Sequence, residues 1–230
     1  MLTTQTMHNE KGYIQFQCNW QASEPPERRV VAPLVGWRDR LHALGLIGVY
    51  PDGIGFGNVS ALRPGKGFVI SGTATGSLPT LGPEHFAEVT DYEIAANTLA
   101  CRGQVRASSE SLSHAAVYEA DPTVGAVFHI HHLGLWERWY GLLPTTHPAA
   151  EAGTPAMAHA IAALLADPEA RARGVFVMGG HREGLMAFGT GPEEAGNRLL
   201  QVFATLTDSE NETHQPAGLA TKPAPSRELP

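Results

Sequence analysis

Ala126-Val-Phe-His129-Ile-His131 is a run of apolar residues and two histidines that predicts a buried β-strand, and the rest of the fold can be arranged around it. Side chains on a strand alternate between its two faces, so the rings of His129 and His131 project from the same face. Phe128 and Ile130 point to the opposite face. Two imidazoles on one face could share a metal ion, and hydrogen bonding of both rings within a half-buried sheet is the alternative explanation.

Short apolar runs and amphipathic segments alternate along the chain on both sides of this strand. Strands are predicted at residues 14–20, 66–71, 125–131, 174–178 and 184–188, and helices at residues 33–45, 83–99, 109–119, 155–165 and 192–205. Helices and strands interleave without strict βαβα order, which favours a mixed sheet with helices on both of its faces. We expect one domain over residues 1–207 and a flexible C-terminal tail over the polar, proline-containing residues 208–230.

The composition is that of an acidic globular protein with few thiols. Its 230 residues include 16 Lys and Arg against 23 Asp and Glu, a net charge of −7, so we expect no nucleic-acid partner. No apolar stretch reaches the ~20 residues that a membrane-spanning helix needs, and the first residues do not have the pattern of a signal peptide. We therefore expect a cytoplasmic protein without membrane association. Cys18 and Cys101 lie outside any CxxC pattern and are expected to be reduced.

Two further residues could complete a site around the paired histidines. Glu110 lies at the predicted start of a helix, where a negative charge is favourable, and Ser108 and Ser109 precede it. His181 lies in a glycine-containing turn between two predicted strands, a position from which a side chain can face a pocket. Taken alone, a first-turn glutamate is usually a favourable dipole contact and a turn histidine is usually solvated.

The ordered set of motifs in the chain is more specific than any one of them. The motifs are Gly57-Asn-Val-Ser60, Ile70-Ser-Gly-Thr-Ala-Thr-Gly76, Ser108-Ser-Glu110 with His114, Ala126-Val-Phe-His129-Ile-His131, Gly153-Thr-Pro155, and His181 with Gly184-Leu-Met-Ala-Phe-Gly189. Over roughly residues 33–205 the sequence resembles the class II aldolase/adducin family. That family includes fuculose-phosphate and rhamnulose-phosphate aldolases, ribulose-phosphate 4-epimerase and methylthioribulose-phosphate dehydratase.

The resemblance implies a fold, a metal centre and an assembly. The fold is α/β, a three-layer αβα sandwich with a central mixed, largely antiparallel sheet. A divalent metal, most often Zn²⁺ with Mn²⁺ or Co²⁺ as alternatives, would be held by His129, His131 and His181, and Glu110 would be the general acid/base. The positions that match the family's substrate and phosphate-binding residues are Asn58, Ser71, Thr75, Gly76, Ser108 and Ser109. A homotetramer with active sites at subunit interfaces is expected.

These residues together suggest a reaction class. Three neutral imidazoles leave a metal ion its full charge and an open position, which suits the stabilisation of an enediolate. We expect a metal-dependent lyase, an aldolase, acting on a small hydroxy-carbonyl substrate, a sugar phosphate. A sugar-phosphate epimerase, dehydratase or decarboxylase on the same site is the alternative, and so is a non-catalytic binding module like the adducin head. Such a module need not retain the metal ligands.

The sequence departs from the family pattern at two places that bear on the site. Arg182 and Glu183 separate His181 from Gly184, an insertion that could shift the ring of His181. Gly55 stands where the aldolases carry a threonine that donates to phosphate. His114 lies one helical turn after Glu110, and we expect it to contact that carboxylate and orient it.

Two other reaction classes fit the sequence poorly. Residues 53–57 read Gly-x-Gly-x-Gly, whose third glycine comes one position too early for a dinucleotide-binding loop, and no convincing strand leads into it. The chain lacks the GxSxG motif of a serine hydrolase.

Overall fold

The structure is a computed structural model that describes residues 16–213 apart from residues 64 and 66. Its strands are β1 (Gln17–Ala22), β2 (Gly48–Val49), β3 (Gly55–Phe56), β4 (Asn58–Leu62), β5 (Phe68–Ser71), β6 (Phe86–Glu93), β7 (Thr98–Gly103), β8 (Ala126–His131), β9 (Val175–Val177) and β10 (Gly184–Gly189). Its helices are α1 (Arg28–Ala43), the 3₁₀ helix η1 (Pro83–His85), α2 (Ser111–Ala120), α3 (Leu133–Trp139), α4 (Pro155–Leu164), α5 (Pro168–Arg173) and α6 (Pro192–Thr213).

Eight of the described strands form one mixed sheet in the order β1-β7-β6-β5-β4-β8-β10-β9. Strand β1 runs parallel to β7, and the other neighbours in this sheet are antiparallel. Strands β2 and β3 form a separate two-stranded hairpin. Both edges of β8 are paired, with β4 and β10, and its side chains enter a hydrophobic cluster on each face of the sheet, which explains its near-continuous apolar sequence.

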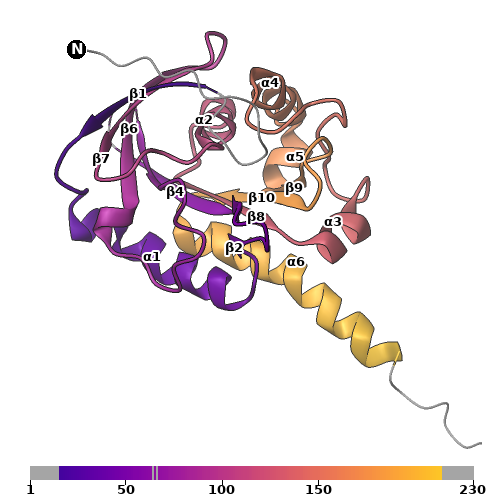
Figure 1. Ribbon diagram of the computed structural model, residues 1–230. Helices are drawn as coiled ribbons and strands as arrows, with labels where there is room; N and C mark the ends of the chain where they lie inside the picture. The colour runs from indigo at the N-terminus through magenta and orange to yellow at the C-terminus, as the bar shows by residue number, and fades with distance from the viewer. Residues whose placement is uncertain (1–15, 64, 66, 214–230) are drawn as a thin grey trace, which may run out of the picture.

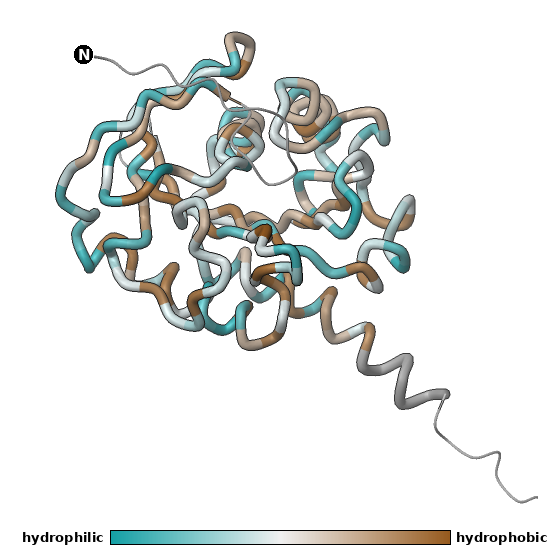
Figure 2. Tube along the Cα trace, viewed as in Figure 1, coloured by the Kyte–Doolittle hydropathy of each residue, from teal (hydrophilic) through white to brown (hydrophobic). Residues whose placement is uncertain are grey.

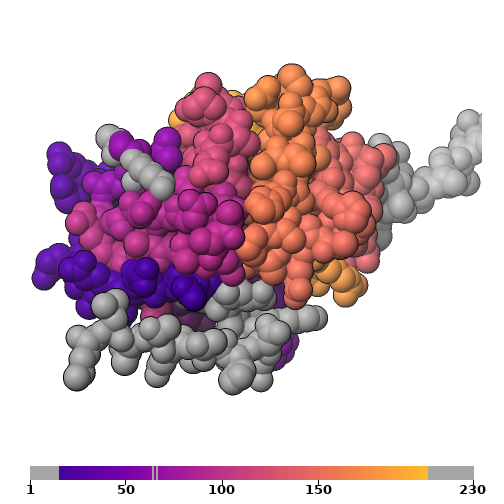
Figure 3. Space-filling model, turned by 90° about the horizontal axis from the view of Figure 1, so that it is seen from above, coloured from indigo at the N-terminus to yellow at the C-terminus, as the bar shows by residue number. Residues whose placement is uncertain are grey.

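Helices cover both faces of the sheet, so the predicted α/β sandwich is confirmed (Figure 1). Helices α1 and α6 pack on one face, and α2, α4 and α5 lie on the other (Figure 1). Figure 3 looks onto this second face, where α2 and α4 lie side by side. Hydrophobic residues are concentrated on the central strands (Figure 2). No helix in the described part of the chain has both the length and the apolar character needed to span a bilayer.

The period-two pattern of β8 divides the core as the sequence predicts. Phe128 and Ile130 belong to the hydrophobic cluster that α1 and α6 cover. Val127 belongs to the cluster beneath α2 and α4. Since alternate residues share a face, His129 and His131 project toward the α2 and α4 side.

The helix predicted at residues 83–99 is wrong. Only Pro83–His85 are helical, as one 3₁₀ turn, and the chain continues as β6 and β7, which pair antiparallel. Phe86, Val89 and Leu99 are buried, so the apolar positions were identified correctly although their period was misread. Asn97 has a positive φ of 52° in the connection between the strands, a conformation that asparagine tolerates in turns.

The two ends of the described chain also differ from expectation. Ile14, part of the strand predicted at residues 14–20, lies outside the described residues, and β1 is an edge strand whose side chains are mostly exposed. Its Cys18 is a free thiol, with Sγ 3.6 Å from Sγ of the free thiol Cys101.

Helix α6 continues to Thr213, into the predicted tail, because no proline or glycine interrupts it there; residues 214–230 lie outside the described part.

Candidate metal centre and its surroundings

Strand β8 delivers two of the three clustered histidines. His129 and His131 are 1% and 8% exposed, and their Nε2 atoms lie 3.0 Å apart. His129 is in register with Asn58 on β4 and with Met186 on β10, so the pair lies in the middle of the sheet. Neighbouring strands on both sides fix the position of the backbone that carries these rings.

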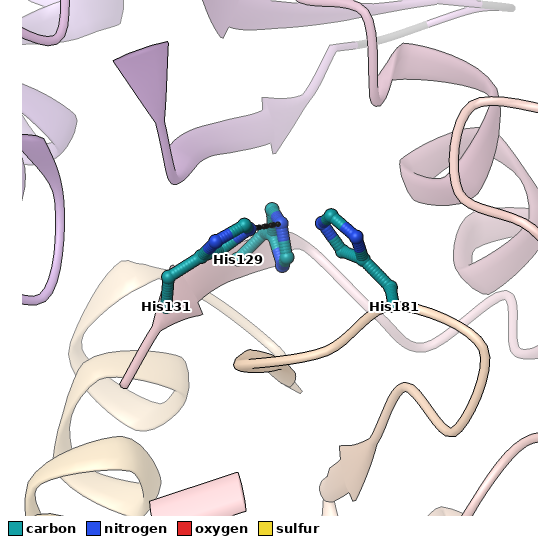
Figure 4. Close-up of side chains that lie close together, drawn as sticks. All are labelled: His129, His131 and His181. Carbon is teal, nitrogen blue, oxygen red and sulfur yellow. Dashed lines mark hydrogen bonds between the residues drawn. The ribbon is translucent and has the colours of Figure 1, made fainter. Parts of the chain in front are cut away.

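His181 comes from the loop between β9 and β10 and points its ring toward the other two (Figure 4). One ligand atom from each histidine lies within 4.8 Å of the others. The loop is tightly turned, because His181 N–H donates to Met178 O and Gly184 N–H donates to His181 O. The two inserted residues, Arg182 and Glu183, are accommodated within this turn, and His181 stays beside β8.

The chemistry of the three side chains fits a divalent metal ion. Burial lowers the pKa of His129 to about 3 and holds the pKa of His131 well below its ordinary value, so both rings are neutral at pH 7. His129 Nδ1 donates to the carbonyl oxygen of Leu185 at 3.1 Å, which leaves the Nε2 lone pair directed at the cluster. Neutral imidazoles whose second nitrogen is held by a carbonyl are common metal ligands.

Glu110 lies at the start of α2 with its side chain buried close to the histidines. It is 8% exposed, and its negative charge favours the protonated form of His129, opposing the effect of burial. Ser113 Oγ donates to Glu110 Oε2 at 2.9 Å. This hydrogen bond orients the carboxylate through its Oε2 atom.

Asn58 and Ser108 are brought together beside Glu110. Asn58 Nδ2 donates to Ser108 Oγ at 2.9 Å, and the same oxygen accepts the Glu110 N–H at 3.3 Å. Ser108 Oγ therefore accepts twice, and its own hydrogen is available to another partner. Among the described residues Asn58 Oδ1 is buried without a partner, so it can accept a hydrogen bond from a substrate hydroxyl. Ser109 is half-buried beside them.

The other predicted substrate-binding residues lie at the end of β5 and on the loop that follows it. Ser71 is 2% exposed, and its Oγ accepts the Val59 N–H at 3.1 Å, so this hydroxyl already takes part in a hydrogen bond between β5 and β4. Thr75 Oγ1 donates to Gly72 O at 2.8 Å. Gly76 packs so closely on the β2–β3 hairpin that an added Cβ would lie 2.1 Å from Gly48 O.

Arg38, which the sequence analysis did not single out, supports that loop from α1. It is 1% exposed, donates from Nη2 to Thr75 O at 2.8 Å, and donates from Nη1 to Leu78 O. Burial lowers the pKa of its guanidinium. An arginine within an amphipathic helix is ordinarily exposed, and only the tertiary structure places the loop carbonyls against this one.

His114 does not make the contact predicted for it. Its Nδ1 lies 2.7 Å from Ser60 Oγ, which also lies 2.7 Å from Tyr118 Oη, and its Nε2 is buried without a partner among the described residues. The partner of Glu110 is instead Ser113, one helical turn after it. The residue that contacts the Glu110 carboxylate is three positions after it, not four. Glu110 is the N-cap residue and lies just before the first residue of α2.

Tyr50 and Phe56 contact the His131 ring, and Glu183 contacts Tyr50. Tyr50 Oη lies 2.8 Å from His131 Nδ1 and 2.6 Å from Glu183 Oε2, and Phe56 stacks on the His131 ring with centroids 5.4 Å apart. Burial and Glu183 raise the pKa of Tyr50, so its hydroxyl stays protonated. Of these three residues, only Glu183 was noticed in the sequence, as part of the insertion after His181. Tyr50 and Phe56 lie outside the motifs that resemble the family.

Part of the chain matches a known protein family. Residues 52–135 match the model of the Class II Aldolase and Adducin N-terminal domain. This segment contains Asn58, Glu110 and two of the three clustered histidines. A comparison with curated protein sequences gives no significant match.

The whole fold is similar to several solved structures. L-fuculose-1-phosphate aldolase from Thermus thermophilus has a TM-score of 0.57 at 19% identity, with 83% of this chain and 100% of that chain covered. YgbL from Klebsiella pneumoniae, named as a candidate aldolase, epimerase or decarboxylase, has a TM-score of 0.60 at 20% identity, covering 82% and 91%. Sugar-phosphate aldolase from Thermotoga maritima has a TM-score of 0.56 at 17% identity, covering 83% and 99%. At these identities the likeness establishes the fold.

Proposed function

We propose that this chain, which belongs to the class II aldolase/adducin family, is a metal-dependent lyase that cleaves a small hydroxy-carbonyl compound, a sugar phosphate. The observation that carries the proposal is the cluster of the buried His129 and His131 with the half-buried His181, beside Glu110. A binding module has no need of neutral, converging imidazoles next to a buried carboxylate. The fold and the family match support this reaction class, and the chemistry of the site residues supports the choice of a lyase within it.

The three histidines would hold a divalent cation, Zn²⁺ in the first instance with Mn²⁺ or Co²⁺ as alternatives. When bound, such an ion supplies Lewis-acid stabilisation of the negative charge that develops on the substrate's oxygens during cleavage. His129 contributes from a rigid strand, with Nδ1 held by Leu185 O. His181 contributes from a loop, so it is the ligand whose position depends most on local packing.

Glu110 would move the proton in the bond-breaking step. Its Oε2 accepts the Ser113 hydroxyl, so Oε1 would take the proton from the substrate hydroxyl and later return a proton to the substrate carbon. The carboxylate is 8% exposed, which keeps bulk water away from the proton being transferred. A positioned acid/base contributes about 10²–10⁴-fold to a rate.

Hydroxyl groups and amides near the start of α2 would bind the substrate's anionic group. Ser108 and Ser109 would donate hydroxyls there, while Asn58 would accept from a substrate hydroxyl through its unpaired Oδ1. The loop of Thr75 and Gly76, held from behind by Arg38, would offer backbone N–H groups. This use of neutral donors and a helix start lets an acidic protein accept one phosphate group.

Metal analysis of the purified protein tests the site. We expect about one tightly bound divalent ion per chain, lost in His129→Ala and His131→Ala and kept in Glu110→Gln. Wild-type protein that neither contains such an ion nor takes it up on addition would refute the metal centre. Glu110→Gln is expected to lower kcat by about 10²–10⁴-fold while the bound metal stays unchanged.

Incubation with a panel of sugar phosphates tests the reaction. Release of dihydroxyacetone phosphate or glycolaldehyde identifies an aldolase, whereas a rearranged or shortened sugar identifies an epimerase, dehydratase or decarboxylase. Complete inertness of metal-loaded protein, together with tight binding to a protein partner, would favour a module like the adducin head. We also propose a cytoplasmic homotetramer with sites at its subunit interfaces, which light scattering tests as a mass about four times that of the chain.

A further inference from the structure

The two inserted residues bring a carboxylate into the surroundings of the histidine cluster. Glu183 adopts a positive φ of 75°, a backbone conformation that is uncommon for residues other than glycine. Its Oε2 lies 2.6 Å from Tyr50 Oη, and Tyr50 Oη lies 2.8 Å from His131 Nδ1. A short chain of hydrogen bonds thus runs from the insertion through a tyrosine to a proposed metal ligand.

Counting hydrogens along this chain fixes the direction of each bond. A phenol has one hydrogen to donate, and a carboxylate oxygen can only accept. Tyr50 therefore donates to Glu183, and the Tyr50 oxygen must accept from His131. The hydrogen of the neutral His131 ring then sits on Nδ1, and Nε2 carries a lone pair.

The same counting applies to the neighbouring ring. Leu185 O can only accept, so His129 Nδ1 carries the hydrogen and His129 Nε2 also has a lone pair. The two Nε2 atoms face each other at 3.0 Å, the contact drawn as a dashed line in Figure 4. With Glu183 present, neither Nε2 atom carries a hydrogen that it could donate to the other. A cation bound by both lone pairs gives each Nε2 atom a partner.

Without the carboxylate, the pair of rings could satisfy itself. Tyr50 would be able to donate to His131 Nδ1, which would move the ring hydrogen to Nε2. His131 Nε2–H would then donate to His129 Nε2 across the 3.0 Å gap. This closed arrangement competes directly with metal binding, since it uses both lone pairs at the metal position.

We propose that Glu183 is a positioning residue that acts through Tyr50 to hold His131 in its Nδ1–H tautomer, which keeps the Nε2 lone pair available to a divalent cation. This role rests on the metal centre of the proposed function. Phe56 stacks on His131, and the Tyr50 ring packs 4.5 Å from Phe56, so the rings keep their places when the carboxylate of Glu183 or the hydroxyl of Tyr50 is removed. Outer hydrogen-bond partners of ligating histidines typically change metal affinity by about 10–100-fold.

Two matched pairs of variants separate this role from general damage. Glu183→Met removes both carboxylate oxygens, and with them the acceptor of the Tyr50 hydroxyl, while keeping a side chain of similar length; Tyr50→Phe removes the hydroxyl while keeping the ring. Glu137→Met and Tyr140→Phe are the controls: Glu137 contacts Arg182 at 3.9 Å, and Tyr140 packs on Trp136, both exposed and away from the His131 hydrogen bonds. The readouts are imidazole ¹⁵N–¹H correlation spectra of the metal-free protein and Zn²⁺ affinity by competition with a chromophoric chelator.

We expect His131 to show the Nδ1–H tautomer in wild type and in both controls. In Glu183→Met the Nε2–H tautomer should predominate, and Zn²⁺ affinity should fall by about 10–100-fold in this variant and in Tyr50→Phe. A wild-type His131 in the Nε2–H form, or a Glu183→Met protein with unchanged tautomer and Zn²⁺ affinity, would overturn the proposal. Failure of wild type to bind Zn²⁺ would instead refute the metal centre, because the tautomer is measured without metal.

Discussion

At the scale of single residues, Gly184 leaves room for two of the clustered histidine rings. A Cβ built at Gly184 would lie 2.6 Å from Cδ2 of His181 and 3.2 Å from Cε1 of His129. His181 is on a loop and would have to move away from His129. The absence of a side chain at this position is therefore a requirement of the cluster's geometry.

Gly184→Ala should weaken metal binding more than it weakens the fold. We expect Zn²⁺ affinity to fall by at least about tenfold, comparable to the loss of an outer partner of a ligand. Gly191→Ala is the control, because an added Cβ there meets nothing within 4 Å. Chelator competition measures the affinity, and equal affinities for the two variants would contradict the steric argument.

The prediction of single residues succeeded where strand periodicity alone decides which face of the sheet a side chain projects from. The shared face of His129 and His131 follows from their spacing, and the structure confirms it. The expected contact of His114 with Glu110 fails, because spacing along a helix does not say which buried hydroxyl competes for the ring. Tyr50 and Arg38 act through contacts with residues more than thirty positions away, which no local pattern encodes.

At the scale of elements, α1 shows a clear division between a buried and an exposed side. Val31, Leu34, Trp37 and Leu41 are buried against the sheet, whereas Gly36 is exposed and an added Cβ there meets nothing within 4 Å. A glycine inside a helix costs about 1 kcal/mol relative to alanine. This position can therefore be improved without disturbing the core.

Gly36→Ala should raise the free energy of unfolding by about 0.5–1 kcal/mol. Gly45→Ala, just after the end of the same helix, should lower it, because Gly45 has a φ of 71° that alanine adopts at a cost. Urea unfolding of the two variants measures both changes. Shifts of the same sign would show that backbone conformation is not the controlling factor.

Helices and strands were predicted correctly where residues typical of a helix start mark the boundary. They were predicted wrongly where the spacing of apolar residues fits both a helix and a strand. Helix α4 begins at Pro155 after Thr154, as its cap-like sequence predicts. The segment 83–99 fits a helix by apolar spacing, but Val89 and Tyr92 favour strands; Val89 pairs with both β5 and β7, and Tyr92 pairs with β7. Pairing partners outside the segment decided its conformation.

At the scale of the whole molecule, burial of neutral imidazoles makes the fold sensitive to acid. His114 is fully buried, and burial lowers its pKa from 6.5 to about 3. Burial has the same effect on His129 and His131. Between pH 6.5 and 3 the unfolded chain binds protons that these rings refuse in the folded state, so the free energy of unfolding falls as the pH falls.

His114→Gln should remove part of that acid sensitivity. Relative to this variant, metal-free wild type should lose about 1.4 kcal/mol of stability per pH unit below pH 6. The exposed His159 is the control, and His159→Gln should follow the wild-type curve. Urea unfolding at pH 7, 6 and 5 measures the three proteins, and parallel curves for wild type and His114→Gln would contradict the assignment.

The sequence by itself determined the class of fold, the strand that carries His129 and His131, and the composition of the candidate metal centre. The fold class and the histidine pair follow from local periodicity, which a strand or helix expresses wherever it is placed, whereas His181 and Glu110 were added by the resemblance of the ordered motifs to a family. Tertiary structure decided that the insertion after His181 supplies Glu183 to Tyr50, that Ser113 rather than His114 serves Glu110, and that Arg38 supports the loop of Thr75. Each of these is a directed hydrogen bond, and the packing of whole elements decides which partners come within hydrogen-bonding distance.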